Sequence, residues 1–466
     1  TSNATPSVAS GVMPRLIGFD PDLKPIPMLA ESWEASEDAT VFTLQLRQGV
    51  MYHDGTPFNA AAAKVNIDRL ANQDNNLRRN SMLRMVDNTE ALDEYTLQIT
   101  LKEPFGALLA TLAHPSIVMH SPAALEKYGD DIGKHMVGTG PFRFVEWVPG
   151  EHVIVEKFDD YWEPDLPKVD RVTVFPVPES ATRVSMLRSD EVQYVATLPA
   201  ELFDSVKEVS EYEVLEIPGI SVWTAAMNMM REEFKDPRVR LAFNLAIDKE
   251  AFMQVVYSGH GVIPTSPIAP NTAFYSAQEP YPYDLERARE LMKEAGYEDG
   301  FALEAWGRNN TAETRMLQFL KQQLSQINVD VTIFPMEPAL RSEKVFSTAS
   351  PETSTHGLLI GGWSPSTGDA DWHLRPVYAT GSWIPKIYNM GFYSNPEVDG
   401  AIEQALKSAD PEVRGTAYAE AQKLIWDDVP VIWFGSENKL AGMRADLTGV
   451  YPMPDGTWTY LQAEFE

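Results

Sequence analysis

The sequence predicts an α/β protein with more than one domain, and three observations carry that prediction. The chain has 466 residues, enough for roughly two to four domains of about 100–200 residues each. Segments with the two-residue period of a strand alternate along it with segments of helical period. A strand, a helix and a strand also follow one another over 302–334, which is typical of a right-handed βαβ unit.

The N-terminal part of the chain begins with strand patterns. Apolar and polar residues alternate in 41–47 and again in 95–101, as expected of half-buried strands. Between them, His53-Asp-Gly-Thr-Pro-Phe58 has the residues of a turn. Asn59 follows directly, and it can cap the alanine-rich helix that we expect next.

The second half of the chain has clearer helix signals. Asp236 followed by Pro237 predicts the start of a helix whose apolar spacing continues up to Gly259. Asp284 predicts the N-cap of another helix, and Gly296 predicts its end. The remaining elements that we expect here are a strand at 302–306, a helix at 312–327, strands at 329–334 and 358–363, and a helix at about 411–426.

The composition limits the partners of the protein. Lys and Arg number 38 against 67 Asp and Glu, which gives a net charge of −29. A strongly acidic chain is unsuited to nucleic acid and to anionic membrane surfaces, so we expect neither as a partner. The chain has no cysteine, which excludes disulfides, thiolate metal sites and thiol nucleophiles, and favours an oxidising compartment.

Motifs of catalysis are missing from the sequence. It contains no Gly-x-Ser-x-Gly elbow and no His-Glu-x-x-His pair. The cluster Asp369-Ala-Asp371-Trp-His373 has metal-ligand residue types, but its spacing matches no standard metal-binding loop. We therefore expect a protein that is not an enzyme, with no catalytic residue, no cofactor and no metal site.

Aromatic and small polar residues instead gather in the loops after one buried strand. They occupy the segments 363–372, 381–385 and 388–396. Ligands of open α/β sheets bind at the carboxyl ends of strands, and aromatic walls with neutral donors suit a small polar ligand. The other interpretation, that the tryptophans only cover a domain edge, stays open at this point.

Several motifs, taken in order, resemble one family. They are Leu29-Ala-Glu-Ser-Trp33, His53-Asp-Gly-Thr-Pro-Phe58, Val137-Gly-Thr-Gly-Pro-Phe142, Asp236-Pro-Arg-Val-Arg240 and Ala288-Arg-Glu-Leu-Met-Lys-Glu-Ala-Gly-Tyr297. Over essentially the whole chain, the sequence resembles the extracytoplasmic solute-binding proteins (family 5) of peptide-, nickel- and opine-type ABC importers. Ser121-Pro-Ala-Ala-Leu-Glu-Lys-Tyr-Gly129, Gly362-Trp-Ser-Pro-Ser-Thr-Gly368 and Phe392-Tyr-Ser-Asn395 are similar to the glutathione-binding members.

The resemblance implies a periplasmic-binding-protein-like fold of two lobes, class II-like and of the large peptide-binding type. Lobe I would comprise 1–32, 164–235 and 436–466, with an inserted subdomain at 33–163 attached to it. Lobe II would comprise 236–435. The lobes of such proteins close around a solute that lies between them.

The implied function is binding and delivery. We expect a periplasmic monomer, exported with its signal peptide removed, that captures a small peptide-like solute and delivers it to ABC permease subunits in the membrane. The expected solute is glutathione or a γ-glutamyl peptide. The alternatives are a short α-peptide, an opine or a metal chelate, and, from another class of function, an extracytoplasmic chaperone.

The charged ends of such a solute need charged partners, because burying an unpaired charge is costly. Peptide-binding relatives use an aspartate for the ammonium at a position where this chain has Ser366, and Asp369 or Asp371 could replace it. Arg341 lies after the 329–334 strand, close to where these relatives hold a carboxylate. It is our first candidate for a ligand carboxylate.

Further candidates follow from residue type and position. Arg79 and Arg308 are second choices for a carboxylate, and Asn228 is a candidate either for ligand contact or for a hinge turn. The other expected ligand-binding residues are Trp306, Trp363 and Trp383 as apolar walls, with Ser364, Thr367 and Asn389 as polar contacts.

Overall fold

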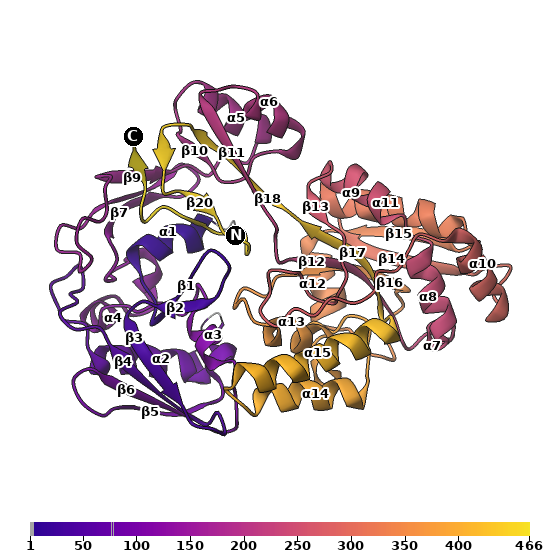
Figure 1. Ribbon diagram of the computed structural model, residues 1–466, viewed down its shortest axis with the longest axis horizontal. Coiled ribbons are helices and arrows are strands. Elements are labelled where there is room, and N and C mark those ends of the chain that lie inside the picture. The colour runs from indigo at the N-terminus through magenta and orange to yellow at the C-terminus, as the bar shows by residue number, and fades with distance from the viewer. Residues whose placement is uncertain (1–3, 76, 78) are drawn as a thin grey trace. The chain divides into compact units, whose positions relative to one another are not determined.

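The computed structural model describes residues 4–75, 77 and 79–466, and it is a mixture of helices and sheets (Figure 1). The chain divides into two compact units. Unit 1 comprises Thr1–Ile217, Leu406–Pro411 and Lys439–Glu466, and unit 2 comprises Pro218–Ala405 and Glu412–Asn438.

The unit boundaries differ in detail from the lobe boundaries expected from the sequence. Residues 218–235 were expected in lobe I, but they supply β12 (Val222–Met227) and α7 (Glu232–Lys235) to unit 2. β12 belongs there because it pairs with two strands of the unit 2 sheet. Residues 33–163 are part of unit 1, and their status as a separate inserted subdomain stays a prediction.

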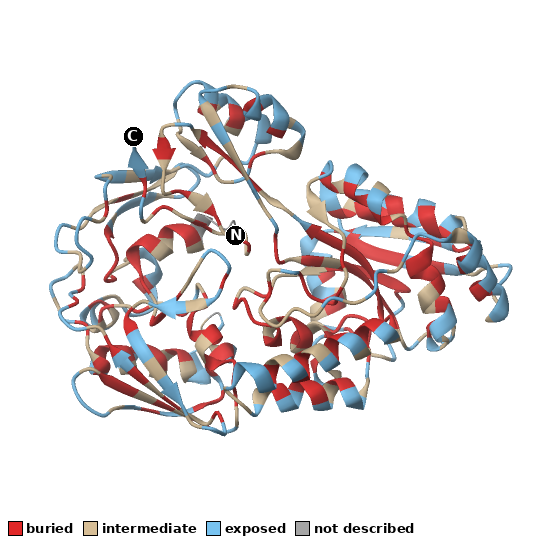
Figure 2. Ribbon diagram, viewed as in Figure 1, coloured by how far each residue is buried: buried red, intermediate tan, exposed pale blue. Residues whose placement is uncertain are grey.

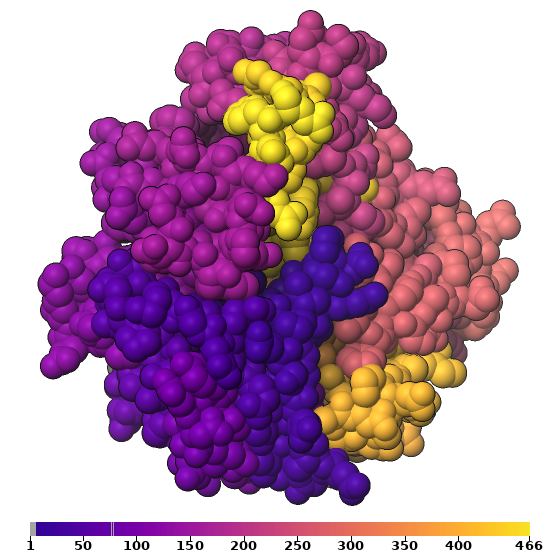
Figure 3. All heavy atoms as spheres, turned by 60° about the vertical axis from the view of Figure 1, so that its left-hand side comes forward, coloured from indigo at the N-terminus to yellow at the C-terminus, as the bar shows by residue number. Residues whose placement is uncertain are grey.

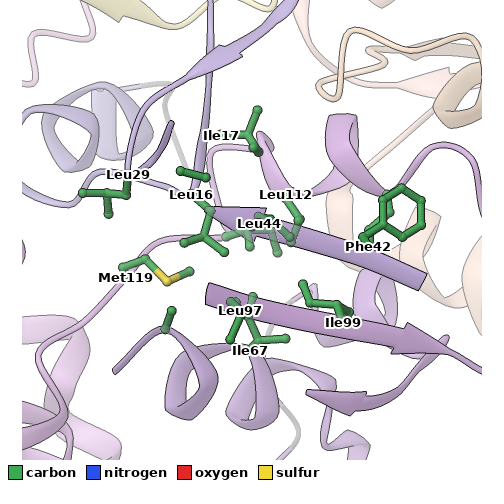
Figure 4. Close-up of a cluster of buried hydrophobic side chains, with 14 of the residues drawn as sticks. Leu16, Ile17, Leu29, Phe42, Leu44, Ile67, Leu97, Ile99, Leu112 and Met119 are labelled. Atoms are coloured by element: carbon green, nitrogen blue, oxygen red, sulfur yellow. The ribbon is translucent and has the colours of Figure 1, made fainter. Parts of the chain in front are cut away.

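One layer of unit 1 is an antiparallel sheet in the order β3 (Ala30–Ala35), β4 (Val41–Leu46), β6 (Thr96–Leu101), β5 (Val86–Ala91). The alternation in 41–47 and 95–101 correctly predicted β4 and β6, whose inward residues face the helix α2 (Ala60–Ala71) (Figure 4). The Asn59 side chain accepts a 3.0 Å hydrogen bond from the Ala62 N–H, which confirms the predicted cap.

The other layer of unit 1 is formed by two small sheets. One has the order β7 (Phe142–Val148), β8 (His152–Lys157), β9 (Arg171–Val174), and the other β10 (Tyr194–Val195), β18 (Lys439–Arg444), β11 (Tyr212–Ile217). The C-terminal residues reach the surface of this unit beside them (Figure 3).

The N-terminal helix α1 (Ala4–Val12) contacts β7 and β8. Two glycines make this contact possible. A Cβ added at Gly138 would lie 2.1 Å from the Val12 carbonyl oxygen, and one at Gly140 would lie 2.3 Å from that of Gly11.

A groove of about 730 Å³ lies in unit 1 next to β9 and β10. Each of the two strands is the edge strand of its own sheet. Val172, Val174 and Tyr194 line the groove and are only half-buried, and Trp458 lies beneath Tyr194 with a ring separation of 5.6 Å.

The remaining elements of unit 1 are short. The helices are α3 (Leu108–Leu112), α4 (Pro122–Tyr128), α5 (Ser180–Arg188) and α6 (Phe203–Lys207), with 3-10 turns at Gln73–Asn75, Asn80–Leu83, Gly129–Lys134 and Ala200–Leu202. The strand pairs are β1 (Ile17–Phe19) with β2 (Pro25–Pro27), β19 (Leu447–Thr448) with β22 (Glu464–Phe465), and β20 (Tyr451–Pro452) with β21 (Trp458–Thr459).

Unit 2 is built on one six-stranded mixed sheet. The order is β13 (Gly261–Val262), β17 (Val431–Glu437), β12, β16 (Leu358–Trp363), β14 (Ala302–Arg308), β15 (Asp330–Met336). β14 runs parallel to β15 and β16, and the other pairs are antiparallel. The central strands are almost wholly buried (Figure 2), which explains why 358–363 is an unbroken apolar run.

Three helices of unit 2 follow from the sequence signals. α11 (Thr311–Ser325) connects β14 to the parallel β15, as the strand–helix–strand pattern predicted. α10 (Leu285–Glu294) is capped by Asp284, whose side chain accepts from the Arg287 N–H. α15 (Pro411–Asp428) matches the predicted helix at 411–426.

The single helix predicted from Asp236 to Gly259 is wrong. The structure has α8 (Pro237–Leu245) and α9 (Lys249–Tyr257). The Asp248 side chain accepts from the Ala251 N–H and so begins a new helix. Both helices bury apolar residues in the same core, and for this reason the apolar spacing continued across the break.

The other elements of unit 2 are α12 (Pro338–Phe346), α13 (Asp371–Tyr378), a 3-10 turn at Thr380–Ser382, and α14 (Pro396–Leu406), whose last residue lies in unit 1. Among the described residues, no helix is long and apolar enough to cross a membrane. Nor does any group of three or more His, Asp or Glu in that part of the chain have the geometry to hold a metal ion.

Buried histidines make the stability depend on pH. Burial lowers the pKa of His114 and His373 to about 3, and that of His120 and His356 to about 4. An unfolded histidine has a pKa of about 6.5, so between about pH 6.5 and 4 the unfolded chain binds protons that the folded protein does not. The free energy of unfolding is therefore expected to keep its highest value above about pH 6.5 and to decrease as the pH drops towards 4.

Denaturant unfolding at pH 7.5, 6.0 and 5.0 measures this dependence. The His373→Phe variant should show a shallower slope, because it removes one of the protons taken up on unfolding. An unchanged slope in this variant would contradict the assignment of His373 as a neutral buried group.

Candidate functional site

The carboxyl end of β16 brings three segments of unit 2 together. Gly361 and Gly362 are needed there, since a Cβ at Gly361 would lie 2.3 Å from the Met390 methyl carbon and one at Gly362 would lie 2.7 Å from the Trp223 ring. The absence of a Cβ at Gly361 leaves room for Met390 and Tyr388, and its absence at Gly362 leaves room for the Trp223 ring.

An aromatic cluster covers this end of the strand. Trp363, the last residue of β16, lies 4.7 Å from the Tyr388 ring, and Tyr388 stacks on Phe346 of α12 at 5.9 Å. The Tyr388 hydroxyl donates a 3.1 Å hydrogen bond to the Gly362 carbonyl, which fixes the ring. We call Arg341, Phe346, Trp363, Tyr388 and Met390 the arginine–aromatic cluster.

Arg341 is the charged member of the cluster and is only 4% exposed. Its guanidinium lies 5.1 Å from the Phe346 ring centre, and its Nη2 lies 4.0 Å from the Met390 sulfur. Among the described residues, the buried Nε has no hydrogen-bond partner. In the described part of the chain, no carboxylate forms an ion pair with it. A buried cation without a counter-ion is costly, so this arginine is suited to an anion from outside the protein.

The loop after Trp363 holds three small polar candidates. The Ser364 hydroxyl is buried and has no hydrogen-bond partner in the part of the chain that the structure describes. The Ser366 hydroxyl is 3.4 Å from the Ser364 carbonyl, and the Thr367 hydroxyl accepts from the Asp369 N–H at 3.4 Å. Among the described residues, the Ser364 hydroxyl therefore has no partner of either kind, whereas those of Ser366 and Thr367 each have one contact.

The two aspartates of the loop are both paired with arginines. Asp369 is 3% exposed, and its Oδ1 accepts a 2.8 Å hydrogen bond from Arg414 of α15. Asp371 accepts two hydrogen bonds, of 2.8 and 2.6 Å, from Arg375. Replacement of the missing ligand-binding aspartate by either residue stays a prediction, and these pairs count against it.

Two other candidates have their polar groups occupied inside the protein. Asn389 donates to the carbonyls of Ala379 and Tyr393 and accepts from the Tyr393 N–H. Trp383 donates its Nε1–H to the Tyr393 carbonyl at 2.7 Å. Buried polar groups must find partners, and these side chains find them within one loop, which they hold in shape.

Asn228 serves the turn after β12 in the same way. Its amide nitrogen donates to the carbonyls of Ser354 and His356, and its amide oxygen accepts from the Met230 N–H. These contacts fit the interpretation of Asn228 as a turn residue better than that of a ligand contact.

The remaining candidates lie on other elements of the fold. Trp306 is buried on β14, donates to Glu304 at 2.9 Å and lies under Lys344 of α12. Arg308 is exposed and pairs with Glu313 at 3.4 Å. Arg79 lies in unit 1, where its charge helps burial to lower the pKa of His114.

The structure adds residues that sequence reasoning did not select. Tyr388 and Phe346 connect Trp363 to Arg341, although 388–396 was noted only as an aromatic segment. The ion-pair partner of Asp369 lies 45 residues away along the chain, and no sequence signal joined the two.

Comparison with known proteins identifies the family. The family described as "Bacterial extracellular solute-binding proteins, family 5 Middle" matches residues 24–384. The glutathione-binding protein GsiB of Pectobacterium atrosepticum is 43% identical over 460 residues, covering 98% of this chain and 89% of that protein. GsiB of Salmonella typhimurium is 40% identical over 461 residues, covering 99% and 90%.

Solved structures share the fold over the whole chain. HbpA2 from Haemophilus parasuis has a TM-score of 0.87 at 23% identity, with 100% of this chain and 96% of that chain covered. The periplasmic binding protein DppA from Helicobacter pylori, in complex with the peptide STSA, has a TM-score of 0.81 at 25% identity, with the same coverage. The fold is thus the two-lobe α/β fold of periplasmic binding proteins, and the chain belongs to family 5 of the bacterial extracellular solute-binding proteins.

Proposed function

We propose that this protein is the periplasmic substrate-binding component of an ABC importer, with glutathione or a γ-glutamyl peptide as its solute. It delivers that solute to permease subunits in the membrane and does not transform it chemically. The names of the relatives that are 40–43% identical over nearly the whole chain support the choice of glutathione.

The observation that carries the proposal is the isolated charge of Arg341. Its guanidinium is buried against Phe346 and has no carboxylate partner in the described part of the chain. A planar guanidinium binds carboxylates through paired hydrogen bonds. Glutathione has two carboxylates, and one of them would satisfy this charge.

The surroundings of Arg341 suit the rest of a small peptide. Trp363 and Tyr388 offer flat apolar surfaces, which pack against methylene and thiol groups. The partnerless hydroxyl of Ser364 supplies a donor and acceptor for an amide. Aromatic surfaces and a neutral hydroxyl beside an arginine favour a ligand in which an uncharged peptide segment adjoins a carboxylate.

The loop aspartates bear on how the ammonium of a bound peptide could be held. Peptide-binding relatives hold an α-ammonium with an aspartate of this loop, whereas this chain has Ser366 there. The nearby Asp369 and Asp371 are neutralised by Arg414 and Arg375. The α-ammonium of an α-peptide therefore meets no free carboxylate on this loop, and the same holds for the α-ammonium of glutathione. The choice of a γ-glutamyl peptide rests on the relatives.

A thermal-shift titration tests the proposal. The protein is first unfolded and refolded to remove any retained solute, and it is then titrated with reduced and oxidised glutathione, γ-Glu-Cys, several α-dipeptides and an opine. A ligand at 100 times its dissociation constant adds about 2.7 kcal/mol to the free energy of unfolding. We expect a rise in Tm with glutathione and γ-Glu-Cys and little change with the dipeptides.

The other outcomes separate the alternatives. A shift with dipeptides or the opine alone would retain the solute-binding role and reject glutathione. Consumption of the solute during the titration would reveal an enzyme, and binding of unfolded chains with no solute effect would reveal a chaperone.

A further inference from the structure

The inner face of α15 carries three buried polar residues at intervals of four. Arg414, Tyr418 and Gln422 are 6%, 0% and 0% exposed. Residues at i, i+4 and i+8 lie on one side of a helix, so they form a continuous polar stripe. Buried polar side chains need hydrogen-bond partners, and two loops of unit 2 supply them here.

Arg414 holds the loop 364–370. Its Nη2 donates to Asp369 at 2.8 Å and to the Tyr418 hydroxyl at 3.3 Å, while the guanidinium lies 4.8 Å from the Phe274 ring centre. The same Asp369 oxygen accepts from the Asp371 N–H at 2.9 Å. One ion pair thus ties the end of the loop both to α15 and to the start of α13.

Gln422 holds the second loop, 266–276, on the same helix. Its amide oxygen accepts from the Ser266 hydroxyl at 2.8 Å and from the Ser276 N–H at 2.9 Å, and its nitrogen donates to the Phe274 carbonyl at 2.8 Å. This loop in turn contacts 364–370, because the Ala273 N–H donates to the Gly368 carbonyl at 2.8 Å.

A buried ion pair such as Asp369–Arg414 needs an explanation other than stability. Desolvation of two charges offsets most of their attraction, and well-packed apolar residues often stabilise a fold as much. Because its hydrogen bonds have fixed directions, such an ion pair instead fixes the conformation of the loop that it holds. The loop that it fixes carries Ser364 and follows directly on Trp363, both part of the proposed site.

We propose that Arg414 is a positioning residue for solute recognition, which fixes loop 364–370 through Asp369 without touching the solute. The inference rests on the proposed function, since it assumes that this loop contacts the solute. It extends the site to a residue that lies 73 positions after Arg341 in the chain.

The test uses variants that avoid a lone buried charge. The double variant Asp369→Asn/Arg414→Met removes both charges, and Arg414→Lys keeps the charge but replaces the planar group. Leu320→Ala, in the core helix α11, is the control for lost stability, because Leu320 is fully buried away from this loop. Glutathione affinity is measured by calorimetry, and amide exchange is followed by mass spectrometry in the absence of solute.

We expect the double variant to fold, to bind glutathione about tenfold or more weakly, and to exchange faster at Ala273 and within 364–371. Arg414→Lys should lie between it and the wild type. Leu320→Ala should lower the Tm and leave the affinity within about twofold. Equal affinities in the double variant and the wild type, or an equal affinity loss in Leu320→Ala, would overturn the proposal.

The two readouts separate this inference from the proposed function. Failure of the wild type to bind glutathione would reject that solute, and the affinity comparison would then use the panel solute that raises the Tm. Unchanged exchange within 364–371 in the double variant would reject the positioning role whatever the solute is.

Discussion

Replacing Arg341 with alanine is expected to weaken glutathione binding by about 2 kcal/mol or more, which is roughly a 30-fold rise in Kd. The substitution removes the buried guanidinium that lacks a carboxylate partner in the described chain. Calorimetric titration of wild type and variant with the same glutathione stock measures the difference.

The same substitution should not destabilise the unliganded protein. An unpaired buried charge raises the free energy of the folded state, so its removal is expected to leave the Tm unchanged or higher despite the lost packing on Phe346. Arg308→Ala is the matched control, since Arg308 is exposed and paired with Glu313. Unchanged affinity in Arg341→Ala, or an equal loss in Arg308→Ala, would exclude Arg341 as the carboxylate-binding residue.

Replacing Phe252 with alanine is expected to lower the free energy of unfolding by about 3–5 kcal/mol. Phe252 is fully buried between the helices and the sheet of unit 2. Its ring stacks on Phe434 at 4.7 Å and meets Phe319 and Tyr257 edge-on at 5.5 Å. The cavity left behind removes all three contacts, and denaturant unfolding measures the cost.

A residue on the same helix provides the control. Val255 lies one turn further along α9 and is 54% exposed, so Val255→Ala should change stability by no more than about 0.5 kcal/mol. Similar losses in the two variants would mean that helix propensity, rather than core packing, accounts for the effect of Phe252→Ala.

The sequence predicted those parts of the fold whose signals are local. Alternation indicated β4 and β6, a side-chain cap indicated α10, and the order of elements indicated the parallel β14–β15 pair. It failed between α8 and α9, because apolar spacing reports burial in a common core and not the continuity of one helix. The cap that begins α9 is Asp248, a residue that the sequence analysis did not select.

The sequence indicated which residue types gather near the candidate site, but it did not indicate what each side chain does there. Trp383, Asn389 and Asn228 have the residue types of a binding site, yet their polar atoms are used to hold loops. Whether a polar group is free depends on contacts between segments far apart in sequence, such as Asp369 with Arg414. The position of Arg341 follows from the resemblance of the sequence, and its lack of an ion-pair partner among the described residues follows from the structure.

The groove beside β9 and β10 has a practical consequence for all these measurements. An edge strand offers unpaired backbone groups, and here two such edges lie along a half-buried apolar surface. Exposed sheet edges of this kind are a general route to pairing between molecules of one protein. Affinities and melting curves therefore need to be recorded at several protein concentrations, with light scattering alongside, so that self-association is not mistaken for a solute effect.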